Sequence, residues 1–253
     1  MPFVQTSYLY TYKELIRFIN NKYISSVKKA IEECIKNGTP ICVDFIINQK
    51  NDAHIWVKMT GSCMYDIYNQ PYMIIGSIFN ITKVKEYENK LLLSATCDDL
   101  TNLIKKTELE RLINLDLESN KIEHYLLLLD LDEFKTINDT YGHLVGDKAI
   151  IFAAKTFTSL CNNKCYIGRF GGDEFIIYTK ERYDKHEIVS LVNEIIKTFN
   201  NGFEHNNITI KLSCSIGISV SPYNGTDYKE LLKKSDLTIY EVKNSGKNSY
   251  KFY

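Results

Sequence analysis

The stretch Arg169-Phe170-Gly171-Gly172-Asp173-Glu174-Phe175 decides how the second half of this 253-residue chain is interpreted. Two adjacent glycines predict a tight turn between two strands, because glycine adopts positive φ and lets a ligand approach the backbone closely. Two carboxylates follow the turn directly. Taken alone, the stretch fits an ordinary hairpin with solvated acids equally well.

A second acidic stretch lies where a buried strand must end. Residues 124–131 form a short apolar run, as in a strand buried on both faces, and it closes with the tract Asp130-Leu131-Asp132-Glu133-Phe134-Lys135. Carboxylates gathered at one edge of a sheet repel one another unless a cation lies between them. The two stretches together therefore predict a site for a hard divalent metal ion.

An amide and a carboxylate nine residues apart, Asn138 and Asp147, come next. A carboxylate can accept hydrogen bonds from both N1–H and the N2 amino group of guanine, whereas adenine has no N1–H to offer. These two side chains therefore indicate a guanine-binding site.

The elements around these motifs predict an α+β domain. We expect helices over residues 144–160, 185–199 and 228–243, two strands within 166–178, and further strand over 208–220. With the strand at 124–131, the order is βαββαβ with additions. This order is typical of a ferredoxin-like antiparallel sheet with helices on one face.

The first region has a different pattern. Its apolar spacing predicts helix from Glu14 to Ile35, interrupted near Asn20-Asn21 and ended by Asn37-Gly38. Strands are expected over 41–48, 53–65 and 72–79, in an antiparallel meander whose turns lie at residues 51–52 and 69–71. A helix of about two heptads begins near Thr82, with Val84, Tyr87 and Leu91 on one stripe.

Composition limits the possible functions. The chain is 44% hydrophobic and 25% charged, as in globular proteins, and its 31 basic residues balance 31 acidic ones. Zero net charge gives no general attraction to nucleic acid or to an anionic membrane, and no apolar run reaches the ~20 residues of a membrane span. Seven cysteines without a Cys-x-x-Cys pair indicate reduced thiols and a cytoplasmic protein.

From Asp98 to Tyr253 the chain resembles a GGDEF-domain diguanylate cyclase, with a nucleotidyl-cyclase-type fold. The motifs that carry the resemblance are Asp98-x-Leu100-Thr101, the 130–135 tract, Asn138-Asp139, Gly142-His143, Gly146-Asp147, the Gly-Gly-Asp-Glu-Phe turn, Ser215-Ile216-Gly217, Ser235-Asp236, Tyr240 and Lys243-x-x-Gly246-Lys247-Asn248. The resemblance implies that two facing protomers, a homodimer, convert two GTP into cyclic di-GMP and two pyrophosphates.

The resemblance also implies roles for the matching residues. Metal ions, Mg²⁺ or Mn²⁺ at two per GTP, would be held by Asp130, the carbonyl of Leu131, Asp173 and Glu174, and the last two would be catalytic. Whether Glu174 is a general base stays open, since an adjacent metal could lower the pKa of the 3′-hydroxyl without it. The substrate-binding residues would be Phe134, Lys135, Asn138, Asp147, Gly171, Gly172, Lys243 and Lys247, with Asn138 and Asp147 on the guanine and the last two on the β- and γ-phosphates.

Two departures from the family pattern matter. Asn102 replaces the usual glycine of the Leu-Thr-Gly-Leu opening, so we expect an altered turn there. The Arg-x-x-Asp of the product-inhibition site is replaced by Asn162 and Cys165. Without a guanidinium to bind phosphates and stack on guanine, we expect no appreciable cyclic di-GMP binding at that site.

The first region resembles the second half of a PAS domain, on the tracts His54-Ile55-Trp56-Val57, Gly76-Ser77-Ile78 and Asn80-Ile81-Thr82. Residues 1–13 leave little room for the first two PAS strands, so we expect a shortened module, its ligand unknown. A small α+β dimerisation or spacer module without a ligand is the alternative. The expected domains are residues 1–81, a connecting signalling helix over 82–97, and 98–253.

Two other functions compete with a cyclase regulated by this module. One is a non-catalytic signalling protein that binds GTP or a cyclic dinucleotide on the same fold; an intact Gly-Gly-Asp-Glu-Phe turn with a lost inhibition site argues against it. The other is a cyclase with a mixed product such as cyclic GMP-AMP, against which Asp147 argues.

Overall fold

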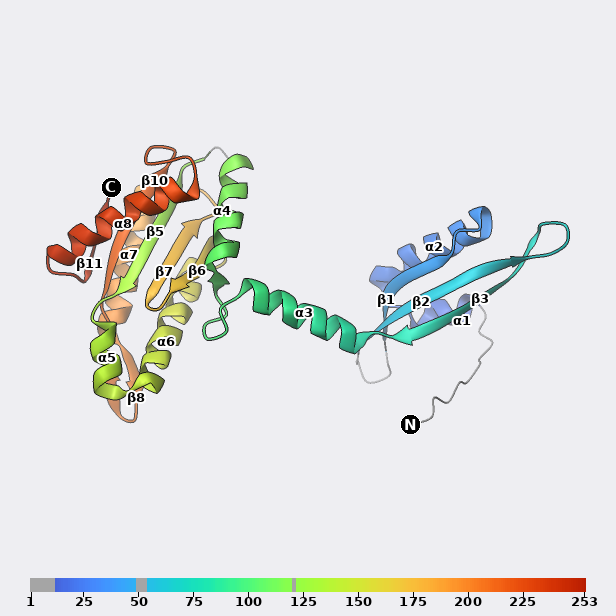
Figure 1. Ribbon diagram of the computed structural model, residues 1–253, viewed down its shortest axis with the longest axis horizontal. Coiled ribbons are helices and arrows are strands. Elements are labelled where there is room, and N and C mark those ends of the chain that lie inside the picture. The colour runs from blue at the N-terminus through green and yellow to red at the C-terminus, as the bar shows by residue number, and fades with distance from the viewer. Residues whose placement is uncertain (1–11, 49–53, 120–121) are drawn as a thin grey trace. The chain divides into compact units, whose positions relative to one another are not determined.

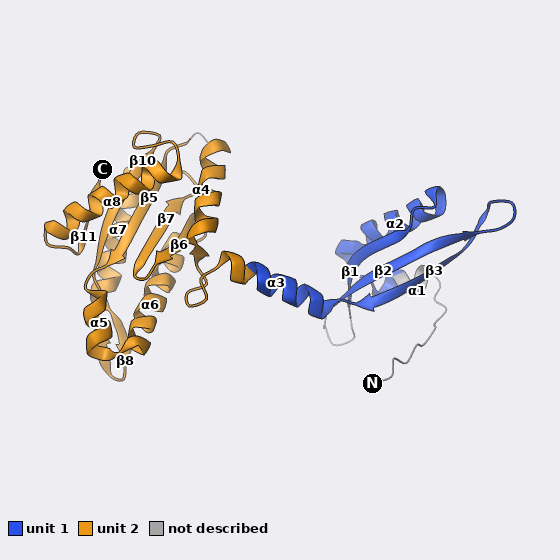
Figure 2. Ribbon diagram, in the orientation of Figure 1, with its two compact units in different colours: residues 1–92 blue, residues 93–253 orange. Residues whose placement is uncertain are grey.

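The computed structural model describes residues 12–48, 54–119 and 122–253 (Figure 1). It divides into two compact units, residues 1–92 (unit 1) and 93–253 (unit 2), as Figure 2 shows. Each unit is considered by itself. The domain boundaries at 81/82 and 97/98 stay predictions.

Unit 1 consists of a helical segment followed by an antiparallel meander. Its elements are α1 (Tyr12–Phe18), a 3₁₀ turn η1 (Asn21–Tyr23), α2 (Ile24–Asn37), β1 (Ile41–Asn48), β2 (His54–Tyr65) and β3 (Pro71–Asn80). Helix α2 is capped at its C-terminal end by Gly38, whose φ of 68° is a left-handed conformation that glycine adopts without strain. The predicted turn at 51–52, Ala53 and the question of strands before residue 12 lie outside the described residues.

The core of unit 1 lies between α2 and its sheet. Val27 and Cys34 of α2 are fully buried, as is Phe45 of β1, while β3 is exposed along its whole length. Helix α3 (Thr82–Thr96) follows β3 after one residue, and Thr82 Oγ1 accepts a hydrogen bond from Trp56 N at 3.0 Å. The predicted helix therefore begins where it was expected and is fastened to β2 at its first residue.

Unit 2 is built around a mixed sheet of six strands among the described residues, in the order β11-β10-β5-β7-β6-β4. Pairs β10–β5, β5–β7 and β6–β7 are antiparallel, and the outer pairs β10–β11 and β4–β6 are parallel. The elements are β4 (Ile104–Lys105), α4 (Lys106–Ser119), β5 (His124–Leu131), α5 (Phe134–Tyr141), α6 (His143–Cys161), β6 (Cys165–Gly171), β7 (Glu174–Thr179), α7 (Lys185–Asn201), β8 (Phe203–His205), β9 (Ile208–Ile210), β10 (Cys214–Ser221), α8 (Tyr228–Asn244) and β11 (Ser249–Phe252).

Helices cover both faces of this sheet, and the expectation of helices on one face was wrong (Figure 1). Leu127 and Leu129 of β5 pack in the core formed with α6 and α7, whereas Leu126 and Leu128 pack with α4 and α8. Burying one leucine side chain stabilises the fold by roughly 1.5–3 kcal/mol, so an uncovered second face would be costly. The α+β fold class is confirmed, and β5 is buried on both faces as predicted.

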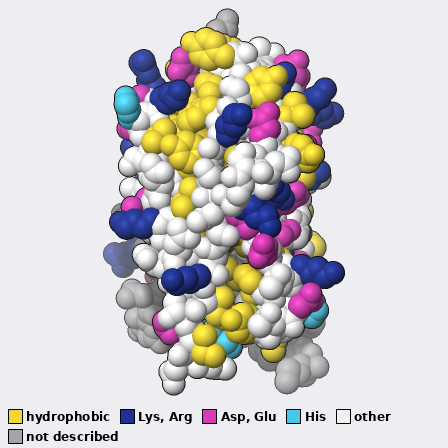
Figure 3. Space-filling view, turned by 90° about the vertical axis from the view of Figure 1, so that its left-hand side faces the viewer, with side chains coloured by type: hydrophobic (Ala, Val, Ile, Leu, Met, Phe, Trp, Pro, Cys, Tyr) yellow, Lys and Arg dark blue, Asp and Glu magenta, His cyan; other side chains and the backbone are white. Residues whose placement is uncertain are grey.

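Several elements of unit 2 were not predicted: α4, α5 and the short strands β4, β8 and β11. The strand expected over 208–220 is two strands, β9 and β10, which belong to different sheets. On the face of the molecule seen in Figure 3, basic, acidic and apolar side chains are interspersed, in keeping with the balanced charge of the chain.

Candidate active site

The register of the sheet brings the two acidic stretches together. Asp130, near the end of β5, lies opposite Glu174 on β7 and opposite Ser215 on β10. Beyond Asp130, the backbone N–H of Leu131 donates to the carbonyl of Asp173 at 3.2 Å. The structure therefore places the four predicted metal-binding residues at the same end of two paired strands.

Burial and mutual repulsion make Asp130 and Glu174 hard to ionise. Burial raises the pKa of Asp130, and the Lys243 ammonium opposes this while the charges of Asp173 and Asp132 add to it. Burial also raises the pKa of Glu174, with further contributions from Asp130 and Asp173. A bound cation would relieve this cost, so the group is suited to hold one.

One cation already lies in this group: Lys243 Nζ of α8 is 2.7 Å from Asp130 Oδ2. Among the described residues, no three His, Cys, Asp or Glu side chains are arranged as a metal cluster. Mg²⁺ commonly binds through one or two carboxylates and completes its shell with water and phosphate oxygens. The carboxylates of Asp130 and Asp173 with the carbonyl of Leu131 fit that kind of metal site, one that is complete only with a phosphate-bearing ligand.

Asp132 holds the loop after α8 against this site. Its side chain is buried, and its carboxylate accepts from Ser215 Oγ at 2.7 Å and from the backbone N–H of Asn248 at 3.0 Å. Lys247, one residue before Asn248, pairs with Glu133 at 2.9 Å. The two predicted phosphate-binding lysines therefore lie beside acids at the end of β5 and just after it. We predicted no such role for Asp132, because only the tertiary structure buries its side chain.

The predicted guanine-binding residues come from α5 and α6, which are joined through Gly142. A Cβ added at Gly146 would lie 1.9 Å from Asn138 Oδ1 and 3.3 Å from Phe134 Cζ. Only glycine therefore lets Asn138 pack against α6, next to the exposed Asp147. The structure places Asn138 against the residue that precedes Asp147, whereas Lys135 lies exposed in the first turn of α5.

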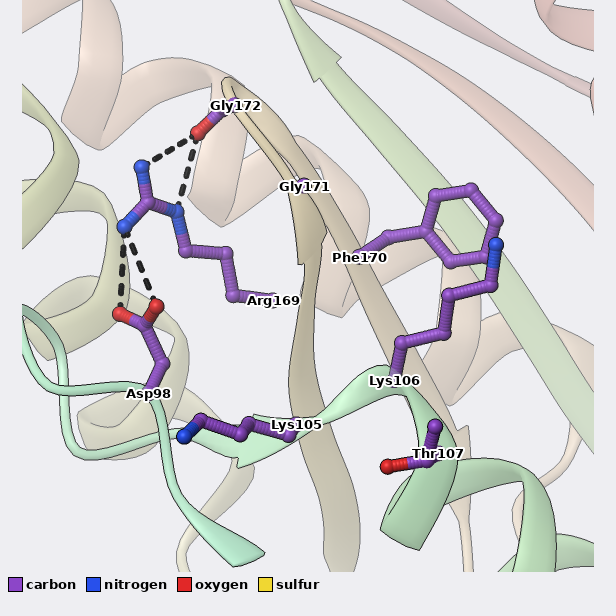
Figure 4. Close-up of a pocket in the computed structure, with 8 residues that line it drawn as sticks. All are labelled: Asp98, Lys105, Lys106, Thr107, Arg169, Phe170, Gly171 and Gly172. Carbon is purple, nitrogen blue, oxygen red and sulfur yellow. Dashed lines mark hydrogen bonds and ion pairs between the residues drawn. The ribbon is translucent and has the colours of Figure 1, made fainter. Parts of the chain in front are cut away.

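The Gly-Gly turn is held by Arg169. The Arg169 guanidinium donates two hydrogen bonds to the carbonyl of Gly172, at 2.9 and 2.7 Å, and contacts both oxygens of Asp98 at 3.2 and 3.3 Å (Figure 4). Gly172 has φ 55°, and space around an added Cβ is open at both glycines. Arg169 thus fixes the turn through the carbonyl of Gly172, while the space beside both glycines stays accessible. These residues, with Lys105, Lys106, Thr107 and Phe170, line a depression of about 460 Å³.

Asp98 also closes the opening turn of the domain. Burial opposes ionisation of Asp98, but hydrogen bonds from Thr101 and Arg169 outweigh it, so the pKa of Asp98 lies below its ordinary value. Asn102 has φ 58° and its N–H donates to the carbonyl of Asp98 at 2.8 Å. Asparagine tolerates this left-handed conformation. The turn that we expected to be altered therefore closes with Asn102 in place of glycine.

The positions of the lost inhibition site lie at the junction of α6 and β6. Asn162 caps α6 in a left-handed conformation and is exposed, whereas Cys165 is buried at the start of β6. Neither offers the guanidinium or carboxylate of the family pattern. The expected absence of product binding stays a prediction.

The order β10-β5-β7-β6 of the four central strands, with acids at two strand ends, defines a ferredoxin-like domain. Residues 95–249 match the family described as diguanylate cyclase, GGDEF domain, and residues 5–78 match the PAS fold. The chain belongs to the GGDEF family and carries a PAS-type module before its GGDEF domain.

Curated relatives agree with this assignment. The chain is 33% identical to the signaling protein YkoW of Bacillus subtilis, over 90% of this chain and 29% of YkoW. It is 29% identical to the probable diguanylate cyclase DgcC of Escherichia coli K12, over 66% of this chain and 46% of DgcC. The chain thus spans less than half the length of these two relatives. Other relatives are named as cyclic di-GMP phosphodiesterases or as bifunctional.

Solved structures agree in fold. The coiled coil and GGDEF domain of DgcB from Caulobacter crescentus, in complex with c-di-GMP, superpose with a TM-score of 0.62 at 21% identity, covering 68% of this chain and 93% of that one. Among the described residues of the present chain, no helix is both long and apolar enough to cross a membrane.

Proposed function

We propose that the chain is a diguanylate cyclase that converts two GTP into cyclic di-GMP and two pyrophosphates, using Mg²⁺ or Mn²⁺ at two ions per GTP. The observation that carries the proposal is the sheet register, which sets Asp130 opposite Glu174 and joins Leu131 to Asp173, with Lys243 paired to Asp130. Family membership supports the same reaction.

In this proposal Asp130, the carbonyl of Leu131, Asp173 and Glu174 hold the metal. When bound, it neutralises the triphosphate and polarises the reacting α-phosphate. Lys243 and Lys247 exchange their present carboxylate partners for the β- and γ-phosphates. The metal then lies beside Asp130, and Glu133 is exposed to solvent. The paired lysines are thus held close to where the phosphates bind.

The remaining residues position the guanine base and the reacting 3′-hydroxyl. Asn138 and Asp147 bind the guanine edge, with Phe134 beside Asn138 and Lys135 near the terminal phosphates. Gly171 and Gly172 leave room for the nucleotide over the turn that Arg169 fixes. Glu174, which lies opposite Asp130 in the sheet register, completes the acidic site beside the 3′-hydroxyl.

Each 3′-hydroxyl attacks the α-phosphate of the other nucleotide, so two copies must face each other. The stripe formed by Val84, Tyr87 and Leu91 of α3 is exposed by 51%, 63% and 71%, which supports pairing of this helix between copies. We infer that the PAS-type module acts through this helix on the orientation of the two domains, in a cytoplasmic homodimer.

The test is incubation of the dimeric protein with GTP and Mg²⁺, with and without ATP, followed by mass analysis of the products. We expect cyclic di-GMP as the product in both cases. Asp173→Ala should abolish it, while Asp99→Ala, at an exposed position of the opening turn, should leave it unchanged. GTP binding without turnover would instead identify a non-catalytic signalling protein, and a mixed product with ATP would show relaxed base selection.

A further inference from the structure

Two cysteines of unit 2 lie at the ends of one short turn. Cys161 is the last residue of α6 and Cys165 the first of β6. Between them Asn162 and Asn163 have φ 43° and 63°, and the N–H of Lys164 donates to the carbonyl of Cys161 at 2.9 Å. Positive φ at both central residues is the geometry of a tight reversing turn. The turn folds the chain back so that both thiols enter the same core, where each perturbs the pKa of the other.

The pair lies at the border of the core. The side chains of Cys161 and Cys165 are 1% and 7% exposed, and both belong to the core that α6 forms with the sheet. The three residues between them are exposed. A short solvent-facing turn therefore connects the two cysteines, and local opening of that turn would admit a small reagent.

The surroundings make the two thiols unequal. The hydrogen bond from Cys161 lowers the pKa of Cys165, and Tyr183, whose hydroxyl is 3.8 Å from Cys165 Sγ, and the Lys180 ammonium act in the same direction against burial and Glu181. The same hydrogen bond, with burial, raises the pKa of Cys161. Cys165 is thus the thiol that ionises first and attacks the reagent. Cys161 is placed to attack the mixed disulfide that forms on Cys165.

We propose that Cys161 and Cys165 are a redox-active dithiol that a small-molecule disulfide such as oxidised glutathione converts to an intramolecular disulfide. The Cys165 thiolate attacks one sulfur of the reagent and forms a mixed disulfide, and the first small thiolate leaves. Cys161 then gives up its proton, attacks the Cys165 sulfur and displaces the second small thiolate. Two protein thiols are oxidised, and one small disulfide is reduced to two thiols.

The bond would join the helix that carries Asp147 to the strand that leads into the Gly-Gly turn. It closes a loop of five residues, 161–165, and chain entropy predicts a shift of the unfolding equilibrium toward the folded state of about thirtyfold. The proposed nucleotide chemistry uses neither thiol, so this inference stands apart from the proposed function.

The test uses a cleavage site that the turn provides. Lys164 lies between the two cysteines, so trypsin separates the peptides 156–164 and 165–169. The whole protein is incubated with oxidised glutathione, its remaining thiols are alkylated, and the digest is analysed without reduction. We expect the two peptides to appear joined, and to separate again after dithiothreitol. Cys214, a fully buried thiol, serves as an internal reference that stays reduced.

Two variants distinguish the roles of the thiols. Cys161→Ala should accumulate glutathione on Cys165, because the resolving thiol is gone, and Cys165→Ala should leave Cys161 unmodified. The oxidised wild type should need more urea to unfold, and Cys165→Ala should show no such change. The proposal is overturned if, in the wild type, both peptides remain separate and reduced under conditions that modify the exposed Cys42, or if they carry only glutathione.

Discussion

Replacing Gly146 with alanine tests the geometry of the proposed guanine site. The new Cβ would lie 1.9 Å from Asn138 Oδ1, a distance that real atoms do not tolerate, so either Asn138 or helix α6 must move. Overpacking of this kind costs about 1–3 kcal/mol, whereas alanine in place of a glycine inside a helix contributes about 1 kcal/mol of stability. The net loss should be about 0–2 kcal/mol. The KM for GTP should rise, since Asn138 no longer reaches the guanine.

A double-mutant cycle separates these contributions. In an Asn138→Ala background the clashing amide is gone, so Gly146→Ala should be neutral or stabilising by up to about 1 kcal/mol, and the coupling between the two sites should be about 1–3 kcal/mol. Urea denaturation followed by circular dichroism measures the four proteins. Fluorescence of Trp56, the single tryptophan, reports the unfolding of unit 1. The urea midpoint of that transition should be the same in all four proteins. Equal destabilisation in both backgrounds would show that the contact with Asn138 is not the reason for a glycine here.

Three further predictions concern the acidic site and its surroundings. Lys243→Met should lower cyclase activity yet tighten binding of Mn²⁺ alone, measured by paramagnetic resonance, because the ammonium no longer competes for Asp130; weaker Mn²⁺ binding would contradict this. The pKa values of Asp130 and Glu174 are raised from 3.8 and 4.5 in the folded state, which therefore binds protons more tightly than the unfolded chain. The free energy of unfolding of the metal-free protein should therefore fall as pH rises from the ordinary pKa values through the raised ones, and Mg²⁺ should reverse this loss. Urea titrations at pH 4 to 7 measure it, and a rise of stability with pH would refute the prediction. Calorimetric titration with cyclic di-GMP should show no tight, saturable binding at the site where Asn162 and Cys165 stand, and tight binding there would disprove the loss of product inhibition.

The strongly patterned elements could be predicted from the sequence. The apolar run of β5 and the helix that ends at Gly38 have local causes, a continuous stretch of leucines and a residue that accepts a left-handed cap. The turn at Gly171 and Gly172 also has a local cause, since two adjacent glycines accept positive φ. Helix α4 was missed although Leu109 and Ile113, four residues apart, form its buried stripe.

Other elements depend on partners far along the chain. Helix α5 begins after Glu133, which has φ 55° and supplies no side-chain cap, so no start signal precedes it. The edge strand β4 is two residues long and is defined by its pairing with β6. Such short strands exist because a neighbouring backbone accepts their hydrogen bonds, and local pattern does not encode that.

By itself the sequence determined which residue types meet in unit 2: acids at two strand ends, an amide and a carboxylate nine residues apart, and lysines at the end of the last helix. Their spacing is local, and local chemistry requires a turn, a strand end or a helix there. Only the tertiary structure decided that Lys243 pairs with Asp130, that Asp132 is buried to hold Asn248, and that Arg169 ties the Gly-Gly turn to Asp98. These contacts join segments about 70 to 115 residues apart, and they form because the core brings β5, β6 and α8 together.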